Sequence, residues 1–161
     1  MRPVLPYSPK TVLAHDAISL PKAHYLSTKS EKESVVNEEL IEAAGREILS
    51  WPGVSKEDMR GGTGKGGFQV PPATVYRFGR RHLGHIHVTG VADITFPRRI
   101  HDELVSEGRA IPHPAGFDGV VSYRIRKSED VPNVVELFRN GYELAKASAE
   151  RREALQARRA G

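Results

Sequence analysis

Residues 68–96 consist of short runs of β-branched and aromatic residues that glycine and proline repeatedly interrupt. Within residues 82–88, "HLGHIHV", polar and apolar side chains alternate, so a strand places His85 and His87 on one face and Ile86 on the other. Runs of this length and composition favour strands over helices. The stretch therefore predicts neighbouring strands of an antiparallel sheet.

Helical patterns flank these strands on both sides. From Asn37, a good N-cap, apolar residues recur at helical spacing until Pro52 interrupts them. Pro97 suits the first position of a second helix, and Ser128 caps a long third helix after a strand at residues 120–126. This order predicts an α+β fold, with an antiparallel sheet of about four to five strands packed by about three helices.

The composition divides the chain into three parts. Residues 1–34 contain four prolines and no sustained period, so we expect an extended or partly disordered arm. Residues 35–146 hold the single α+β domain, and residues 147–161 form a basic helical tail. No signal-peptide core is present, and no stretch approaches the roughly 20 apolar residues that span a bilayer. We therefore expect a soluble, cytoplasmic protein without a membrane partner.

Several function classes lack support in the sequence. The chain has no cysteine, which excludes disulfides, thiolate metal sites and a cysteine nucleophile. The glycine-rich residues 60–67 contain a G-x-G-x-x-G spacing, but a β-like stretch follows where a dinucleotide site requires a helix. We interpret them as a mobile loop. With one tryptophan and no stacking platform, the chain is not expected to bind nucleic acid.

The net charge of +4 is unevenly distributed. No acidic residue lies between Asp58 and Asp93. The same span carries three clustered histidines and five fixed positive charges, Arg60, Lys65, Arg77, Arg80 and Arg81. A surface built from such a span attracts anions. We therefore expect a small anionic ligand, with Arg77, Arg80, Arg81 and, from a later strand, Tyr123 as candidate ligand-binding residues.

His85 and His87 can converge on one ligand, whereas His82 is out of phase with them in a regular strand. One interpretation is a metal site with Asp93 or His113 as third ligand, since two histidines and a carboxylate suit iron and three histidines suit zinc. A second is an acid/base or ligand-binding role, because the imidazole pKa lies near neutrality. A third is ordinary polar histidines. The basic surroundings disfavour a bare dication, so we favour the metal-free role.

Four segments in order carry a family resemblance: "RRHLGHIH", "ADITF", "GRAIPHPAG" and "SYRIRKSEDVPNVVELF". Together they resemble the luciferase-domain family, which includes the luciferases of fungal bioluminescence and many small bacterial proteins. Fungal members carry a further histidine after the D-x-T segment, where Phe96 stands here. The resemblance therefore extends to the fold more strongly than to light emission.

The resemblance implies an enzyme, an oxidoreductase of the oxygenase type. It would oxidise a phenolic or hydroxypyrone small molecule with molecular oxygen as co-substrate and without a cofactor. On this hypothesis His85 or His87 is the base and Arg81 stabilises the anion. Asp93 orients an imidazole, and His113 closes the site. Two alternatives stay open: a non-catalytic module that binds a small anion, and a metal enzyme that uses His85, His87 and His113.

Overall fold

The computed structural model describes residues 31–64 and 66–160, so most of the predicted arm lies outside the described residues. The elements are α1 (Glu31–Leu49), β1 (Val54–Met59), β2 (Gly62–Thr63), β3 (Gln69–Val70), β4 (Ala73–Phe78), β5 (Arg81–His87), β6 (Val91–Thr95), α2 (Arg98–Ser106), β7 (Ile111–Pro112), β8 (Val120–Arg124) and α3 (Asp130–Ala160). Six strands form an antiparallel sheet in the order β1-β4-β5-β6-β8-β7, and β2 pairs with β3 separately. The predicted α+β class is confirmed, with more strands than expected.

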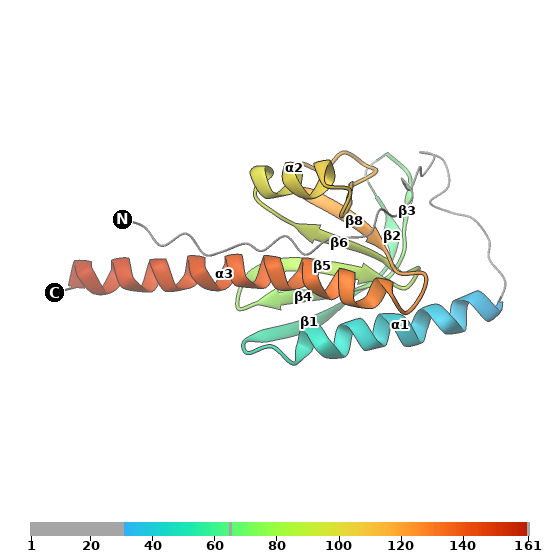
Figure 1. The fold of residues 1–161 in the computed structure, drawn as a ribbon, viewed down its shortest axis with the longest axis horizontal. Coiled ribbons are helices and arrows are strands. Elements are labelled where there is room, and N and C mark those ends of the chain that lie inside the picture. Colours follow the sequence, from blue (N-terminus) through green and yellow to red (C-terminus); the bar gives the residue numbers. More distant parts are fainter. Residues whose placement is uncertain (1–30, 65, 161) are drawn as a thin grey trace.

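Helices α1 and α3 pack on one face of the sheet, and α3 runs across β4, β5 and β6 (Figure 1). The apolar side chains of the strands meet α3 on this face. The ring of Tyr76 lies 5.4 Å from that of Phe138, and the ring of Phe78 lies 5.2 Å from that of Tyr142. Because successive strand residues alternate between faces, the polar residues of β5, β6 and β8 that alternate with these apolar residues point to the other face of the sheet, away from α3.

A register shift in the β4–β5 pair changes which residues share that opposite face. Tyr76 pairs with Gly84 and Arg77 pairs with His82, so Leu83 is the extra residue of a β-bulge. The bulge returns His82 to phase with His85, and their ring centroids lie 5.7 Å apart. The expectation that His82 is out of phase holds only for a regular strand, and this strand is not regular.

Three features differ from the sequence-based expectation. Strand β2 lies within the glycine-rich segment that was interpreted as a mobile loop, where it pairs with β3. Strand β1 was missed because its side chains are mostly charged and exposed, as suits an edge strand, and they show no apolar alternation. Helix α1 begins at Glu31, within the segment expected to be an arm. The basic tail is the continuation of α3, which projects beyond the sheet (Figure 1). No helix within residues 31–64 or 66–160 has both the length and the apolar character that crossing a bilayer requires.

Gly84 permits a close approach of β5 to β6 and α3. A Cβ at this position would lie 2.5 Å from the backbone oxygen of Asp93 and 3.0 Å from Cε1 of Phe138. We expect Gly84→Ala to lower the free energy of unfolding by about 1–3 kcal/mol, because a backbone atom cannot yield without shifting the strand. Gly62→Ala is the matched control, since its Cβ meets nothing within 4 Å. Urea denaturation measures both, and equal effects would contradict the prediction.

Tyr76 makes the fold sensitive to alkali. Burial chiefly, with the charge of Asp58, raises the pKa of Tyr76 to about 12. Its stabilising effect is complete below pH 10 and is lost as the pH rises towards 12, because the unfolded tyrosine ionises first. We expect the wild type to lose roughly 1 kcal/mol per pH unit relative to Tyr76→Phe over this window. Urea denaturation at pH 8 and pH 11 tests this, and a difference that does not change with pH would refute it.

Candidate functional site

The register of three strands aligns the central residues of the site. His85 of β5 pairs directly with Asp93 of β6, and Asp93 pairs directly with Ser122 of β8. Directly opposed residues project to the same face, so the three side chains form a row across the middle of the sheet. His87 follows two residues along β5 and shares this face. The row lies on the face of the sheet that points away from α3. The neighbouring residues Ile94 and Val121 point to the α3 side and belong to the hydrophobic core.

Asp93 is the centre of this site, and its side chain is fully buried. One carboxylate oxygen, Oδ1, accepts a short hydrogen bond from the hydroxyl of Ser122. The other, Oδ2, faces three imidazole nitrogens. The Nε2 atoms lie at 3.3 Å for His85, 3.2 Å for His87 and 3.5 Å for His113. The structure thus brings all four predicted catalytic residues together around one oxygen atom, and we call them the Asp93 cluster.

Opposing effects act on the pKa of Asp93. Burial raises it, whereas contacts with the three imidazoles, His113 foremost, and with Ser122 lower it more. The pKa therefore lies well below its usual range, and the carboxylate is charged. A buried charge of this kind requires compensation from its neighbours, which the imidazoles and the hydroxyl provide. Oδ2 nevertheless lacks a hydrogen bond of normal geometry among the described residues.

The outer nitrogens of two imidazoles show where their protons lie. Nδ1 of His87 is 3.0 Å from the carbonyl oxygen of Pro71, which only accepts, so Nδ1 carries a proton. Nδ1 of His113 accepts the backbone N–H of Ala115 at 3.1 Å, so a neutral His113 carries its proton on Nε2. When both rings are neutral, Nε2 of His87 therefore directs a lone pair at Asp93, whereas Nε2 of His113 directs an N–H at it.

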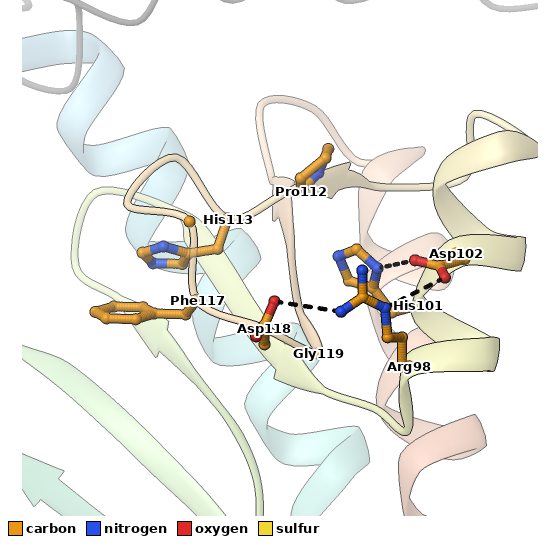
Figure 2. A pocket seen from close by; sticks show the side chains of 9 residues that line it. Arg98, His101, Asp102, Pro112, His113, Phe117, Asp118 and Gly119 are labelled. Carbon is orange, nitrogen blue, oxygen red and sulfur yellow. Dashed lines mark hydrogen bonds and ion pairs between the residues drawn. The ribbon is translucent and has the colours of Figure 1, made fainter.

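A cavity of about 140 Å³ lies beside His113, between α2 and the loop at residues 112–119 (Figure 2). The ring of Phe117 packs against that of His113, with centroids 4.7 Å apart. Arg98 lies across the cavity with charged and polar neighbours from α2 (Figure 2). The side chains of His85 and His113 are 21% and 13% exposed, compared with 4% for His87. A ligand can therefore reach His85 and His113 before it reaches His87.

The predicted ligand-binding residues lie outside the Asp93 cluster. Arg80 and Arg81 are exposed at the β4–β5 turn, at the other end of β5 from His87. Arg77 shares the face of His82 but pairs with Glu57 at 3.2 Å. Tyr123 neighbours Ser122 and so projects to the α3 side.

The hydroxyl of Tyr123 contacts Asp130 and Asn133, both at the start of α3. None of the four predicted ligand-binding residues makes a described contact with Asp93. Their role in binding stays a prediction that rests on charge.

Three contributors to the site were missed from the sequence. Ser122 alternates with the apolar residues of β8, so the predicted pattern of that strand already implied a polar side chain on the opposite face. The position of His82 beside His85 depends on the β-bulge in β5. Its pKa is lowered by burial, then by the nearby charges of His85 and Arg77. The carbonyl of Pro71 carried no signal in the sequence, because its contact with His87 depends on tertiary structure.

Among the described residues, one group has the spacing to hold a metal ion: His85, His87 and Asp93. One ligand atom from each lies within 4.8 Å of the others. His113 is not part of this group.

The domain is thus an antiparallel sheet covered by helices on one face, with a buried carboxylate among imidazoles on the other. The luciferase-domain family model matches residues 80–141, which include all four residues of the Asp93 cluster. The resemblance predicted from the sequence is confirmed over this segment. Searches of curated proteins and of solved structures gave no match.

Ser122 is expected to stabilise the fold through Asp93. In Ser122→Ala the buried carboxylate loses the one hydroxyl donor that it has among the described residues, which we expect to lower the free energy of unfolding by about 1–3 kcal/mol. Ser55→Ala, on the exposed part of edge strand β1, should change it by no more than about 0.5 kcal/mol. Chemical denaturation of both variants decides the matter, and a Ser122→Ala protein as stable as the Ser55→Ala protein would show that the hydroxyl is dispensable.

Proposed function

We propose that this protein is a luciferase-like oxidoreductase. It oxidises a small molecule with an acidic hydroxyl group, phenolic or hydroxypyrone in type, with molecular oxygen. The carrying observation is the Asp93 cluster, in which three imidazoles surround one buried carboxylate within the segment that matches the luciferase domain. Light emission is not part of the proposal.

The cluster suits the first step, which is loss of the proton from the substrate hydroxyl. Imidazole exchanges protons near neutral pH, and a buried carboxylate beside it holds the ring in place and stabilises its charged form. His85 is the most exposed of the three rings and so the first to meet a substrate. Asp93 is buried and held by Ser122, which makes it a positioning residue.

Positive charge near the site suits the second step. The anion left by deprotonation is electron-rich at carbon and forms a bond to one atom of O₂. The proton held by the cluster then passes to the other oxygen atom, so a neutral hydroperoxide forms and no external reductant is needed. Both the anion and the peroxide are stabilised by positive charge. In the cluster, the imidazole that has taken up the substrate proton supplies this charge.

The cavity beside His113 offers a place for part of the substrate. Phe117 supplies an aromatic surface at its edge, and Arg98 and His101 supply polar groups. At about 140 Å³ it is smaller than a typical ligand pocket of roughly 300 Å³ or more. We therefore assign it one ring of the substrate, with the rest extending towards His85.

Oxygen uptake tests this proposal directly. Purified full-length protein is mixed with a 3-hydroxy-styryl-pyrone while dissolved oxygen and light emission are recorded. We expect His85→Ala to reduce the rate of uptake at least about 100-fold, since a positioned proton-exchanging group contributes this much or more. Lys56→Gln is the control. Lys56 pairs with Tyr76 and so lies on the α1 side of the sheet.

Two outcomes would overturn the proposal. Absence of uptake together with a shift in pyrone absorbance would identify a binding module that does no chemistry. Equal uptake by the wild type and His85→Ala would place any oxidation outside the Asp93 cluster.

A further inference from the structure

Oδ2 of Asp93 is the least satisfied atom in the site. It is fully buried and charged, and it has no hydrogen bond of normal geometry among the described residues, although three nitrogens face it at 3.2–3.5 Å. Buried polar atoms in native proteins nearly always have a partner, and those that lack one often mark the place of an ion or a water molecule. The contacts around Oδ2 therefore suggest a binding partner between the oxygen and the nitrogens.

The orientation of His87 favours a positively charged partner. Its Nδ1–H is directed at the carbonyl of Pro71, so a neutral ring turns the lone pair of Nε2 towards Oδ2 of Asp93 at 3.2 Å. Two acceptors that face each other at this distance repel. A cation between them converts the repulsion into two bonds. A ring N–H donated to a backbone carbonyl is also the usual way in which proteins orient a metal-binding histidine.

The distances fit a transition-metal ion. Two ligand atoms on a tetrahedral ion, each about 2.0–2.1 Å from it, lie roughly 3.3–3.4 Å apart. Oδ2 of Asp93 lies 3.3 Å from Nε2 of His85 and 3.2 Å from Nε2 of His87. Nδ1 of His85 has no described hydrogen-bond partner, so nothing prevents its proton from residing there and leaving Nε2 as a ligand.

We propose that His85, His87 and Asp93 bind a divalent first-row transition-metal ion such as iron(II), zinc or cobalt(II). Imidazole ligands exclude calcium and magnesium as the preferred ions. Two histidines and one carboxylate leave coordination positions open for an oxygen ligand. This is the alternative that the sequence left open, with Asp93 as the third ligand.

His113 contacts the ligand Asp93 and does not bind the ion itself. Its Nδ1 accepts the N–H of Ala115, so its Nε2 carries a proton and donates towards Asp93 rather than binding a metal. Ser122 holds the other carboxylate oxygen of Asp93. The ligand carboxylate and the ligand His87 therefore both have groups that fix their orientation, as established metal sites do.

The basic residues that argued against a metal ion in the sequence lie away from the Asp93 cluster in the structure. Arg77 is paired with Glu57, and Arg80 and Arg81 are exposed at the far end of β5. Exposed charges at a distance are largely screened by solvent. The charged carboxylate of Asp93 lies in direct contact with the proposed ion, so attraction at short range outweighs repulsion at long range.

Cobalt(II) binding tests the inference, because cobalt in a site of low coordination number gives visible absorption bands. Untagged full-length protein is treated with a chelator, desalted and titrated with Co²⁺. We expect one equivalent to bind. His85→Ala should lose the bands and bind Co²⁺ at least about 100-fold more weakly, a larger loss than the roughly 10- to 100-fold typical when a residue that only holds a ligand in place is changed. Asp93→Asn provides a second variant of nearly unchanged shape.

Two histidine variants serve as controls. His113→Ala should keep the visible bands, with affinity reduced by no more than about 100-fold, because it removes a group that contacts Asp93 and not a ligand of the ion. His101→Gln should bind like the wild type, since His101 pairs with Asp102 on α2. The inference fails if the wild type binds no Co²⁺, if His85→Ala and Asp93→Asn both bind as tightly as the wild type, or if His113→Ala loses the bands.

This inference rests on the geometry of the Asp93 cluster and gives His85 the role of a ligand in place of that of a base, so it and the proposed reaction can fail separately. Specific Co²⁺ binding without oxygen uptake in the iron(II)-, zinc- or cobalt-loaded protein would refute the oxidoreductase and leave the metal site standing. Undiminished uptake by chelator-treated protein that binds no Co²⁺ would refute the metal site and leave the oxidoreductase standing.

Discussion

A carboxylate in the middle of a sheet costs several kcal/mol unless charged or hydrogen-bonded groups surround it. The groups that surround Asp93 come from three places in the chain: His85 and His87 from β5, Ser122 from β8 and His113 from the loop after β7. Each contact is possible only in one strand register, because a slip of one residue would turn Asp93 towards α3. The Asp93 cluster and the sheet therefore specify each other.

The two faces of the sheet carry different kinds of side chain. Helices α1 and α3 cover one face, where Ile86, Ile94 and Phe138 are almost fully buried. The other face is then free to carry polar groups that a two-sided core would exclude. The bulge at Leu83 increases this polar face, because it adds His82 to the side of His85 without displacing Leu83 from the core. In a regular β5, His82 could not lie on the side of His85 while Leu83 lies in the core.

Local patterns predicted those parts of the fold that depend on neighbouring residues. Alternation in β5 correctly placed His85 and His87 on one face. Pro97 and Ser128 lie within two residues of the starts of α2 and α3, although Pro97 is the N-cap rather than the first helical residue and the Ser128 hydroxyl contacts Glu129 instead of capping the helix. The meeting of Asp93 with His113 was not predictable in this way, since it depends on the long-range order β6-β8-β7. Arg81, although only four residues from His85, lies at the opposite end of the strand, because each strand residue advances the chain by about 3.3 Å.

The segment that matches the luciferase domain, residues 80–141, contains every side chain of the Asp93 cluster but lacks β4 and the carbonyl of Pro71. That carbonyl fixes the proton of His87 and thereby decides whether Nε2 offers a lone pair to the site. If a dication binds as proposed, one carboxylate leaves an excess positive charge, which an anionic oxygen of the proposed substrate would neutralise as a further ligand.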